Sequence, residues 1–198
     1  EALGSQVIAR HVHEFAVLHP DIEIELVAET RRMSLSKREA DIVISLSRPD
    51  SGRLIAWKLC EYRLRLFAAR EYLARYPPIT SVEDLVHHDF VSYIEDLIVM
   101  PELRFFDTTV KNAHVVFRST NVSAQFNAIL QGIGLGLVHC FMARREPELQ
   151  VVLPDQISVE RSYWLLVHED LRHVARVDAV CQFLTRILGE DPALMMGA

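Results

Sequence analysis

The chain has 198 residues, of which 50% are hydrophobic, 8% aromatic and 24% charged, with 7 Gly and 8 Pro. This composition excludes disordered, collagen-like and low-complexity architectures, and the length allows one large domain or two lobes of about 100 residues each. The net charge of −6 makes the chain by itself a poor candidate for binding a nucleic-acid backbone. No apolar run approaches the ~20 residues that span a bilayer, so the sequence predicts a soluble protein.

The cysteines indicate a reducing compartment. Cys60, Cys140 and Cys181 are three in number and far apart in sequence, which does not fit a secreted disulfide scaffold and favours the cytoplasm. The sequence opens at Glu1 without a methionine, so we expect it to be part of a longer protein.

Helical and strand patterns alternate along the chain. Helical spacing of Ile8, Val12 and Phe15 predicts a helix over 5–19 that begins at Ser5 as the N-cap. Strict alternation predicts a strand over 22–26, and a short helical turn is expected at 35–39. A β-branched run at 41–46 is typical of the fully buried centre of a parallel sheet. Further on, the patterns predict strands at 62–69, 90–93, 115–118 and 163–167, and a glycine-punctuated turn into a buried strand over 132–139. They predict helices at 70–76, after a Ser81 capping box, at 121–131 and, with one apolar stripe, near the end up to Gly189. Such alternation predicts an α/β fold with mostly parallel sheets.

The glycines at 132, 134 and 136 do not form a dinucleotide-binding loop. That fingerprint requires a strand before the glycines and a helix after them, whereas here a helix precedes and a strand follows. We interpret them as a helix C-cap with close backbone packing.

The sequence also lacks a recognisable metal-binding or catalytic motif. His168-Glu169 and His173 resemble a zinc motif, but histidines five apart diverge by about 140° on a helix, so they do not share a face. The sequence has no G-x-S-x-G elbow, and Cys140 follows a predicted buried strand as a structural thiol. We therefore predict no enzyme activity, no cofactor and no metal site.

Two predicted helix openings form a candidate anion clamp. Leu3-Gly4-Ser5 and Ser119-Thr120-Asn121 each precede a helix, and helix N-termini present unpaired N–H groups with a partial positive charge. Ordinary helix capping accounts for both. If the two openings face each other across a cleft, they also suit a carboxylate or a phosphate.

The order and spacing of several short segments give the chain its family resemblance. Together they resemble the effector-binding domain of LysR-type transcriptional regulators over essentially the whole chain. The segments are EALGS at 1–5, HPDIEIEL at 19–26, READIVI at 38–44, LIAWKL at 54–59, EYL at 71–73, DL at 84–85 with HDFV at 88–91, and AILQGIGL at 128–135.

The resemblance implies an α/β fold like that of type II periplasmic binding proteins, with two Rossmann-like lobes joined by two crossover strands. Lobe I would comprise residues 1–66 plus 164–198, with its first strand missing, and lobe II residues 67–163. The crossover strands would pass near Leu66 and Trp164.

The resemblance also implies a small-molecule effector between the lobes, often a carboxylate. The positions that match the family's effector site are Leu3, Gly4, Ser5, Arg31, Ser45, Leu46, Ser47, Tyr93, Thr120, Asn121, His139 and Phe141.

The family pattern further implies an N-terminal winged helix-turn-helix, which is absent here, so promoter DNA would be bound only through that missing domain. We expect antiparallel homodimers, in which the 5–19 helix of one copy meets the 121–131 helix of the other, and tetramers of the full-length protein. The alternatives are a periplasmic solute-binding protein of a transporter, which would carry an export signal, and an enzyme of similar two-lobed shape.

Overall fold

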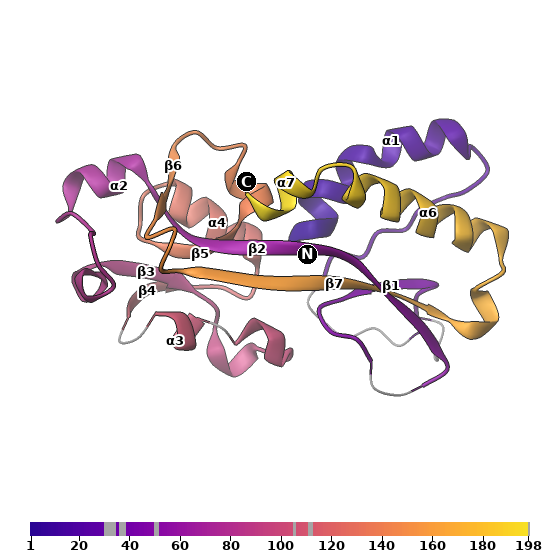
Figure 1. The fold of residues 1–198 in the computed structure, drawn as a ribbon, viewed down its shortest axis with the longest axis horizontal. Helices are drawn as coiled ribbons and strands as arrows, with labels where there is room; N and C mark the ends of the chain where they lie inside the picture. The colour runs from indigo at the N-terminus through magenta and orange to yellow at the C-terminus, as the bar shows by residue number, and fades with distance from the viewer. Residues whose placement is uncertain (30–34, 36–38, 50–51, 105, 111–112, 198) are drawn as a thin grey trace.

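Two long antiparallel strands run through the molecule from one end to the other. The computed structural model describes residues 1–29, 35, 39–49, 52–104, 106–110 and 113–197. Strand β2 (Leu54–Ala69) and strand β7 (Ser158–His168) run antiparallel along the long axis, with α2, β3 and β4 near one end and α1, α6 and β1 near the other (Figure 1). Their register extends from Leu54 opposite His168 to Arg65 opposite Ser158.

Strand β2 is longer than the sequence pattern predicts. Its second half alternates between buried Tyr62, Leu64 and Leu66 and more exposed neighbours, and this half was predicted as a strand. The first half is half-buried on both faces and a register shift lies between Lys58 and Cys60, so no clear period is visible there.

The end that carries β1 differs from the expectation of mostly parallel sheets. Strand β1 (Ile42–Ser45) pairs antiparallel with β7 at the edge of a five-stranded sheet, and its residues are half-buried rather than fully buried. The segment 22–26 is not a strand, because no ladder partner for it lies in the described residues. It keeps the expected alternation, with Ile22 and Ile24 half-buried and Glu23 and Glu25 exposed. The predicted helical turn at 35–39 lies mostly outside the described residues.

At the opposite end, β5 (Gly136–His139) and β6 (Leu149–Val152) pair antiparallel with β2. Strands β3 (Asp89–Ser92) and β4 (His114–Arg118) form the parallel pair, close to the predicted positions. The helices here are α2 (Arg70–Arg75), α3 (Phe106–Thr109), α4 (Val122–Leu130) and α5 (Cys140–Ala143), with short 3-10 turns η2 (Glu83–His87), η3 (Glu95–Leu97) and η4 (Pro101–Leu103). The expected Ser81 capping box forms in part: the Asp84 carboxylate accepts hydrogen bonds from the Thr80 and Ser81 amides, but η2 has Val82 as its N-cap, without a side-chain cap bond.

The first and last long helices lie side by side (Figure 1). The first consists of a π-helical turn, η1 (Gly4–Ile8), continued by α1 (Ala9–Leu18), and the last is α6 (Ala175–Gly189), followed by α7 (Pro192–Met196). The rings of Phe15 and Phe183 lie 5.1 Å apart, and Arg186 donates to Glu14 at 3.0 Å. These contacts join the two helices despite their separation in sequence.

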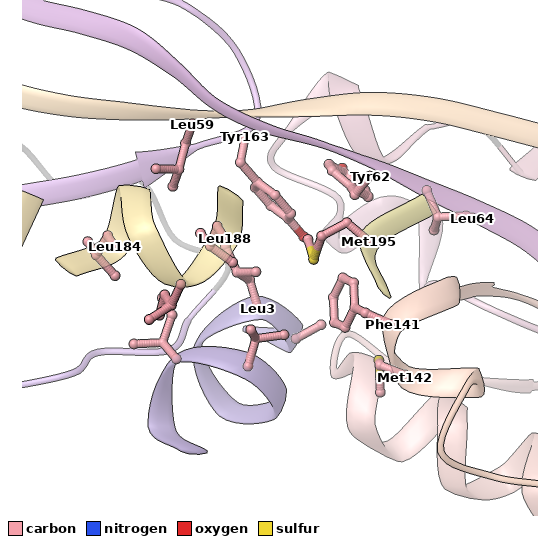
Figure 2. Close-up of a cluster of buried hydrophobic side chains, with 14 of the residues drawn as sticks. Leu3, Leu59, Tyr62, Leu64, Phe141, Met142, Tyr163, Leu184, Leu188 and Met195 are labelled. Carbon is pink, nitrogen blue, oxygen red and sulfur yellow. The ribbon is translucent and has the colours of Figure 1, made fainter. Parts of the chain in front are cut away.

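The buried apolar side chains form two clusters. The larger one joins η1, α6, α7 and the middle of β2 and β7, where Tyr62, Tyr163 and Phe141 pack beside Leu188 and Met195 (Figure 2). The members of the smaller one fall between Leu66 and Ile157. The larger cluster spans both ends of the molecule, since it also includes Val91, Phe126 and Ile129, whereas the smaller one belongs to the end that carries β3.

Two glycines confirm the interpretation of the 132–136 segment. Gly132 has a φ of +73° directly after α4, the left-handed conformation of a helix C-cap. A Cβ atom on Gly134 would lie 2.5 Å from the Asp89 carbonyl oxygen, so the backbones approach too closely for a side chain.

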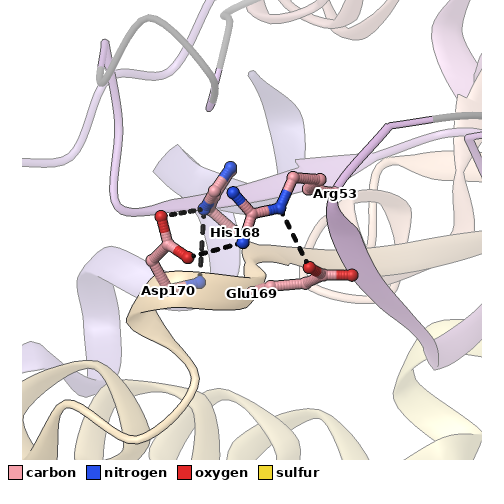
Figure 3. A network of polar contacts seen from close by, with 4 residues as sticks. All are labelled: Arg53, His168, Glu169 and Asp170. Atoms are coloured by element: carbon pink, nitrogen blue, oxygen red, sulfur yellow. Dashed lines mark hydrogen bonds and ion pairs between the residues drawn. The ribbon is translucent and has the colours of Figure 1, made fainter.

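A polar network ties the outer ends of β2 and β7. Arg53, just before β2, contacts Glu169 at 3.2 Å and Asp170 at 3.0 Å beyond β7 (Figure 3). His168 Nδ1 accepts from the Asp170 amide at the start of η5 (Glu169–Leu171), so it serves as a helix cap there. The ion pairs are exposed and contribute little to stability.

Candidate functional site

A cavity of about 840 Å³ opens between the start of the first helix and the sheet. Its walls come from distant parts of the chain: residues 1–4, the 22–29 segment, β1 with the loop after it, the tyrosines of β2 and β7, and Val122 with His139. One side, formed by Ile22, Ile24, Ile44 and residues of α6, is largely apolar.

The cavity brings together seven of the twelve predicted site residues. Those that line it are Leu3, Gly4, Ser45, Leu46, Ser47, Tyr93 and His139. Ser5, Thr120 and Asn121 are exposed and do not line it, and Phe141 is buried in the larger apolar cluster. Arg31 lies outside the described residues.

Ser5 is not the N-cap that the sequence pattern predicts. The helix already includes Ala2 and Leu3, and the Ser5 amide and hydroxyl both donate to the Glu1 carbonyl at 3.0 Å. Its hydrogen-bonding groups are therefore used within the first turn of the helix.

The opening of α4 forms as predicted and holds a carboxylate. Asn121 is its N-cap, with its side-chain oxygen 2.7 Å from the Ala124 amide. The Val122 amide donates to Glu1 Oε2 and the Ser123 hydroxyl donates to Glu1 Oε1, both at 2.7 Å. The two predicted helix openings therefore lie together, and the anion between them is the side chain of Glu1.

Sequence reasoning missed Glu1 as a site residue. A carboxylate just ahead of a helix was the available signal, since acidic side chains favour helix N-termini. The sequence pattern gave no indication that this carboxylate serves a second helix more than a hundred residues away.

His139 is the buried polar side chain of the cavity. It is 7% exposed, and its ring lies 5.4 Å from that of Tyr62 at an interplanar angle of 22°. Nδ1 is buried without a hydrogen-bond partner. Burial lowers the pKa of His139 to about 3, so the imidazole is neutral at pH 7.

Three buried tyrosines line the same cavity as His139. Tyr62 stacks on Tyr163 with ring centroids 4.2 Å apart, and Tyr93 lines the same cavity. Burial raises the pKa of Tyr62, Tyr93 and Tyr163 above its usual range, so all three remain neutral at physiological pH. Tyr62 and Tyr163 were missed by sequence reasoning, because a strand tyrosine gives no sign of what it packs against.

Carboxylates outnumber cationic groups in the described lining. Arg176 is the one Lys or Arg side chain among the described lining residues, and it lies 3.8 Å from Asp41. The carboxylates are those of Glu1, Glu23, Glu25, Glu29, Glu39, Asp41 and Glu102.

The described residues hold no group of three His, Cys, Asp or Glu side chains that could bind a metal ion. Burial raises the pKa of Cys60 to about 12 and that of Cys181 to about 11, so these thiols are poor nucleophiles. Within the same part of the chain, no helix combines the length and apolarity needed to cross a membrane.

Comparison with known sequences identifies relatives among bacterial regulators. The chain is 26% identical over 197 residues to the glycine cleavage system transcriptional activator homolog of Haemophilus influenzae, and 24% identical over 195 residues to the HTH-type transcriptional regulator PtxR of Pseudomonas aeruginosa. The alignments cover 96% and 95% of this chain but 64% and 61% of the relatives, so the chain spans less than two thirds of their length.

Comparison with solved structures confirms the predicted architecture. The regulatory domain of CrgA, a LysR-type transcriptional regulator from Neisseria meningitidis, superposes with a TM-score of 0.82 at 22% identity, covering 94% of each chain. The effector domain of AmpR of Pseudomonas aeruginosa gives a TM-score of 0.72 at 18% identity, covering 97% of this chain and 93% of that one. Identities this low establish the fold alone, an α/β fold of the type II periplasmic-binding-protein kind.

The family model described as the LysR substrate binding domain matches residues 1–189. The chain therefore belongs to the family of LysR substrate-binding domains.

Proposed function

We propose that the chain is the effector-binding and oligomerisation domain of a bacterial LysR-type transcriptional regulator that acts in the cytoplasm. A small molecule binds in the cavity between the first helix and the sheet. This changes how an attached N-terminal domain engages promoter DNA. The family match supports this function over a periplasmic transport protein or an enzyme.

One observation carries the proposal: a single cavity is walled by parts of the chain from both ends of the long strands. Leu3 and Ser45 belong to the end that carries α1 and β1, whereas Val122 and His139 belong to the other end. A ligand bound there contacts both ends, so its affinity depends on their relative position. Such differential affinity is what lets a ligand shift a conformational equilibrium.

We infer that the two ends are lobes with the predicted boundaries, residues 1–66 plus 164–198 and residues 67–163. The smaller apolar cluster supports the second lobe, because it draws on residues 66–157. Strands β2 and β7 serve as the connection, since they continue from one end to the other.

Lobe I is completed by one further strand, supplied by chain on the N-terminal side of Glu1. Two extended segments support this inference. The 22–26 segment has no ladder partner in the described residues, β1 is paired with β7 on one side, and both segments line the apolar side of the cavity. In a protein that includes this strand, the amide of Ile24 exchanges with solvent more slowly than in the 198-residue chain. Equal exchange rates would contradict the inference.

The domain dimerises through its first helix. The exposed side of α1 carries Val17 and Leu18, which are 66% and 68% exposed, and apolar surface of this kind favours association. The partner surface is α4 of the second copy, with the adjacent Val116 of β4 at 41% exposure. This gives an antiparallel dimer, and tetramers follow in the full-length protein.

The effector site comprises the predicted residues that line the cavity, with His139 and Tyr93 at its polar end. The test is a thermal-shift screen of the protein against a metabolite library. A true effector stabilises the wild type, and its effect falls in His139→Leu and Tyr93→Phe. The matched control Thr120→Ala changes an exposed residue outside the cavity and keeps the full effect. A ligand whose stabilisation survives both cavity substitutions would refute this site.

A further inference from the structure

Glu1 occupies the position where α4 would receive an anionic ligand. The helix has nine residues, and its N-terminal end carries a partial positive charge. Each oxygen of the Glu1 carboxylate accepts one hydrogen bond there, from the Val122 amide and from the Ser123 hydroxyl. The chain's own carboxylate thus takes the place of a ligand's carboxylate or phosphate.

Ala124 and Ser5, two further donor residues of the expected anion clamp, also have partners. The Ala124 amide donates to Asn121 Oδ1 at 2.7 Å, and the Ser5 amide and hydroxyl donate to the Glu1 carbonyl. An incoming anion at this position would therefore have to displace Glu1 and would meet its negative charge.

His139 offers a different kind of contact in the same cavity. It is more than nine-tenths buried, and its Nδ1 has no hydrogen-bond partner. A buried polar atom without a partner calls for one, and a bound ligand can supply it. Because the imidazole is neutral at pH 7, it suits an uncharged hydroxyl, carbonyl or amide group.

We propose that Glu1 determines the class of effector: its carboxylate fills the anion-binding end of α4, and the cavity takes an uncharged polar molecule that hydrogen-bonds to His139 Nδ1. The inference rests on the proposed function, since an effector class has meaning only if the cavity binds an effector. The expected effector is therefore an uncharged polar molecule and not a carboxylate.

Acetate is the probe for Glu1, because it reproduces the side-chain carboxylate. In the wild type, the NMR signals of the Val122 and Ser123 amides stay in place as acetate is added. In Glu1→Ala the same signals move and saturate, with an acetate Kd lower than that of the wild type by at least about tenfold. Glu25→Ala, which removes another carboxylate of the cavity wall, behaves as the wild type does.

If Glu1→Ala fails to fold, Glu1→Gln gives the same test. Its amide oxygen still accepts from one donor but carries no charge, so acetate binds more weakly than to the alanine variant and more strongly than to the wild type. The inference is overturned if acetate shifts the wild-type amides with the same Kd as the variant, or if a foldable variant shows no response.

The effector found by the metabolite screen gives the second test. An uncharged hit that perturbs the His139 ring signals supports the inference, and an anionic hit that moves the Val122 amide of the wild type overturns it. A screen with no hit in any class counts against the proposed function, while the acetate titration still decides the role of Glu1.

Discussion

The Glu1 carboxylate lies 2.7 Å from the backbone nitrogen of Val122, although 121 residues separate the two in the chain. This contact joins the first residue of one helix opening to the first residue of another. It brings the helix at one end of the molecule to the edge of the cavity that the other end completes. The contact therefore contributes both to stability and to the chemistry of the cavity.

Removal of this contact should destabilise the fold measurably. Glu1→Ala leaves the Val122 amide and the Ser123 hydroxyl without their charged acceptor. We expect the free energy of unfolding to fall by about 1–3 kcal/mol, the usual range for hydrogen bonds to a charged group. Urea denaturation measures it, with Glu25→Ala as a control that changes the stability by less than about 0.5 kcal/mol. Equal stability of the two variants would show that the contact does not form in solution.

Acidification should destabilise the chain through His139. The unfolded imidazole binds a proton near pH 6.5, whereas the folded one does so only near pH 3. Between these values the unfolded state holds more protons, so stability falls as the pH falls. From pH 7 to pH 5 the expected loss is about 2 kcal/mol.

The substitution His139→Phe isolates this effect, because the ring can still stack on Tyr62 but no longer titrates. His88, whose pKa is also lowered by burial, contributes equally to both proteins. The loss of stability between pH 7 and pH 5 should therefore be smaller in the variant than in the wild type. Parallel pH profiles would mean that His139 is protonated normally in the folded chain.

Two glycine substitutions should act in opposite directions. Gly134→Ala places a methyl group 2.5 Å from the Asp89 carbonyl oxygen, so the backbone must move, at a cost of about 1–3 kcal/mol. At Gly189, at the end of α6, an added Cβ would meet no atom within 4 Å beyond the adjoining turn of its own helix, so Gly189→Ala should stabilise the chain by up to about 1 kcal/mol. Thermal unfolding of the two variants separates the effects, and a neutral Gly134→Ala would contradict the close packing.

The dimer should depend on the exposed end of α1. Leu18→Glu places a charge in the proposed interface and should yield monomers at concentrations where the wild type is dimeric, as measured by light scattering. Val86→Glu is the control, because Val86 is 55% exposed and belongs to η2, which is not one of the two proposed interface helices. Monomers of the wild type at tens of micromolar, or a dimer insensitive to Leu18→Glu, would refute this interface.

Local signals predicted much of the fold. The N-cap within 119–121, the glycine C-cap after α4 and the apolar stripe of α6 are each specified by residues a few positions apart, and all three form as expected. The order of the segments gave the family, which the match over residues 1–189 confirms.

Long-range relationships account for what the sequence did not reveal. The antiparallel pairing of β1 with β7 depends on residues more than a hundred positions away in the chain. The β-branched composition of β1 therefore predicted a central parallel strand where the structure has an antiparallel edge strand. The alternation at 22–26 predicts a strand, but a ladder also needs a partner. Ser5 has the residue type of an N-cap, yet the helix begins earlier and its hydroxyl bonds within the turn. Glu1 and Tyr163 lie in the site because of tertiary packing, which no local sequence pattern indicates.

The most direct test of the proposed sensor is a footprinting titration of the full-length regulator on its promoter with the effector from the metabolite screen. The account predicts that the effector changes the protected region at concentrations near its Kd and that His139→Leu weakens this response while leaving effector-free DNA binding intact. A footprint that is identical with and without a saturating effector would contradict it.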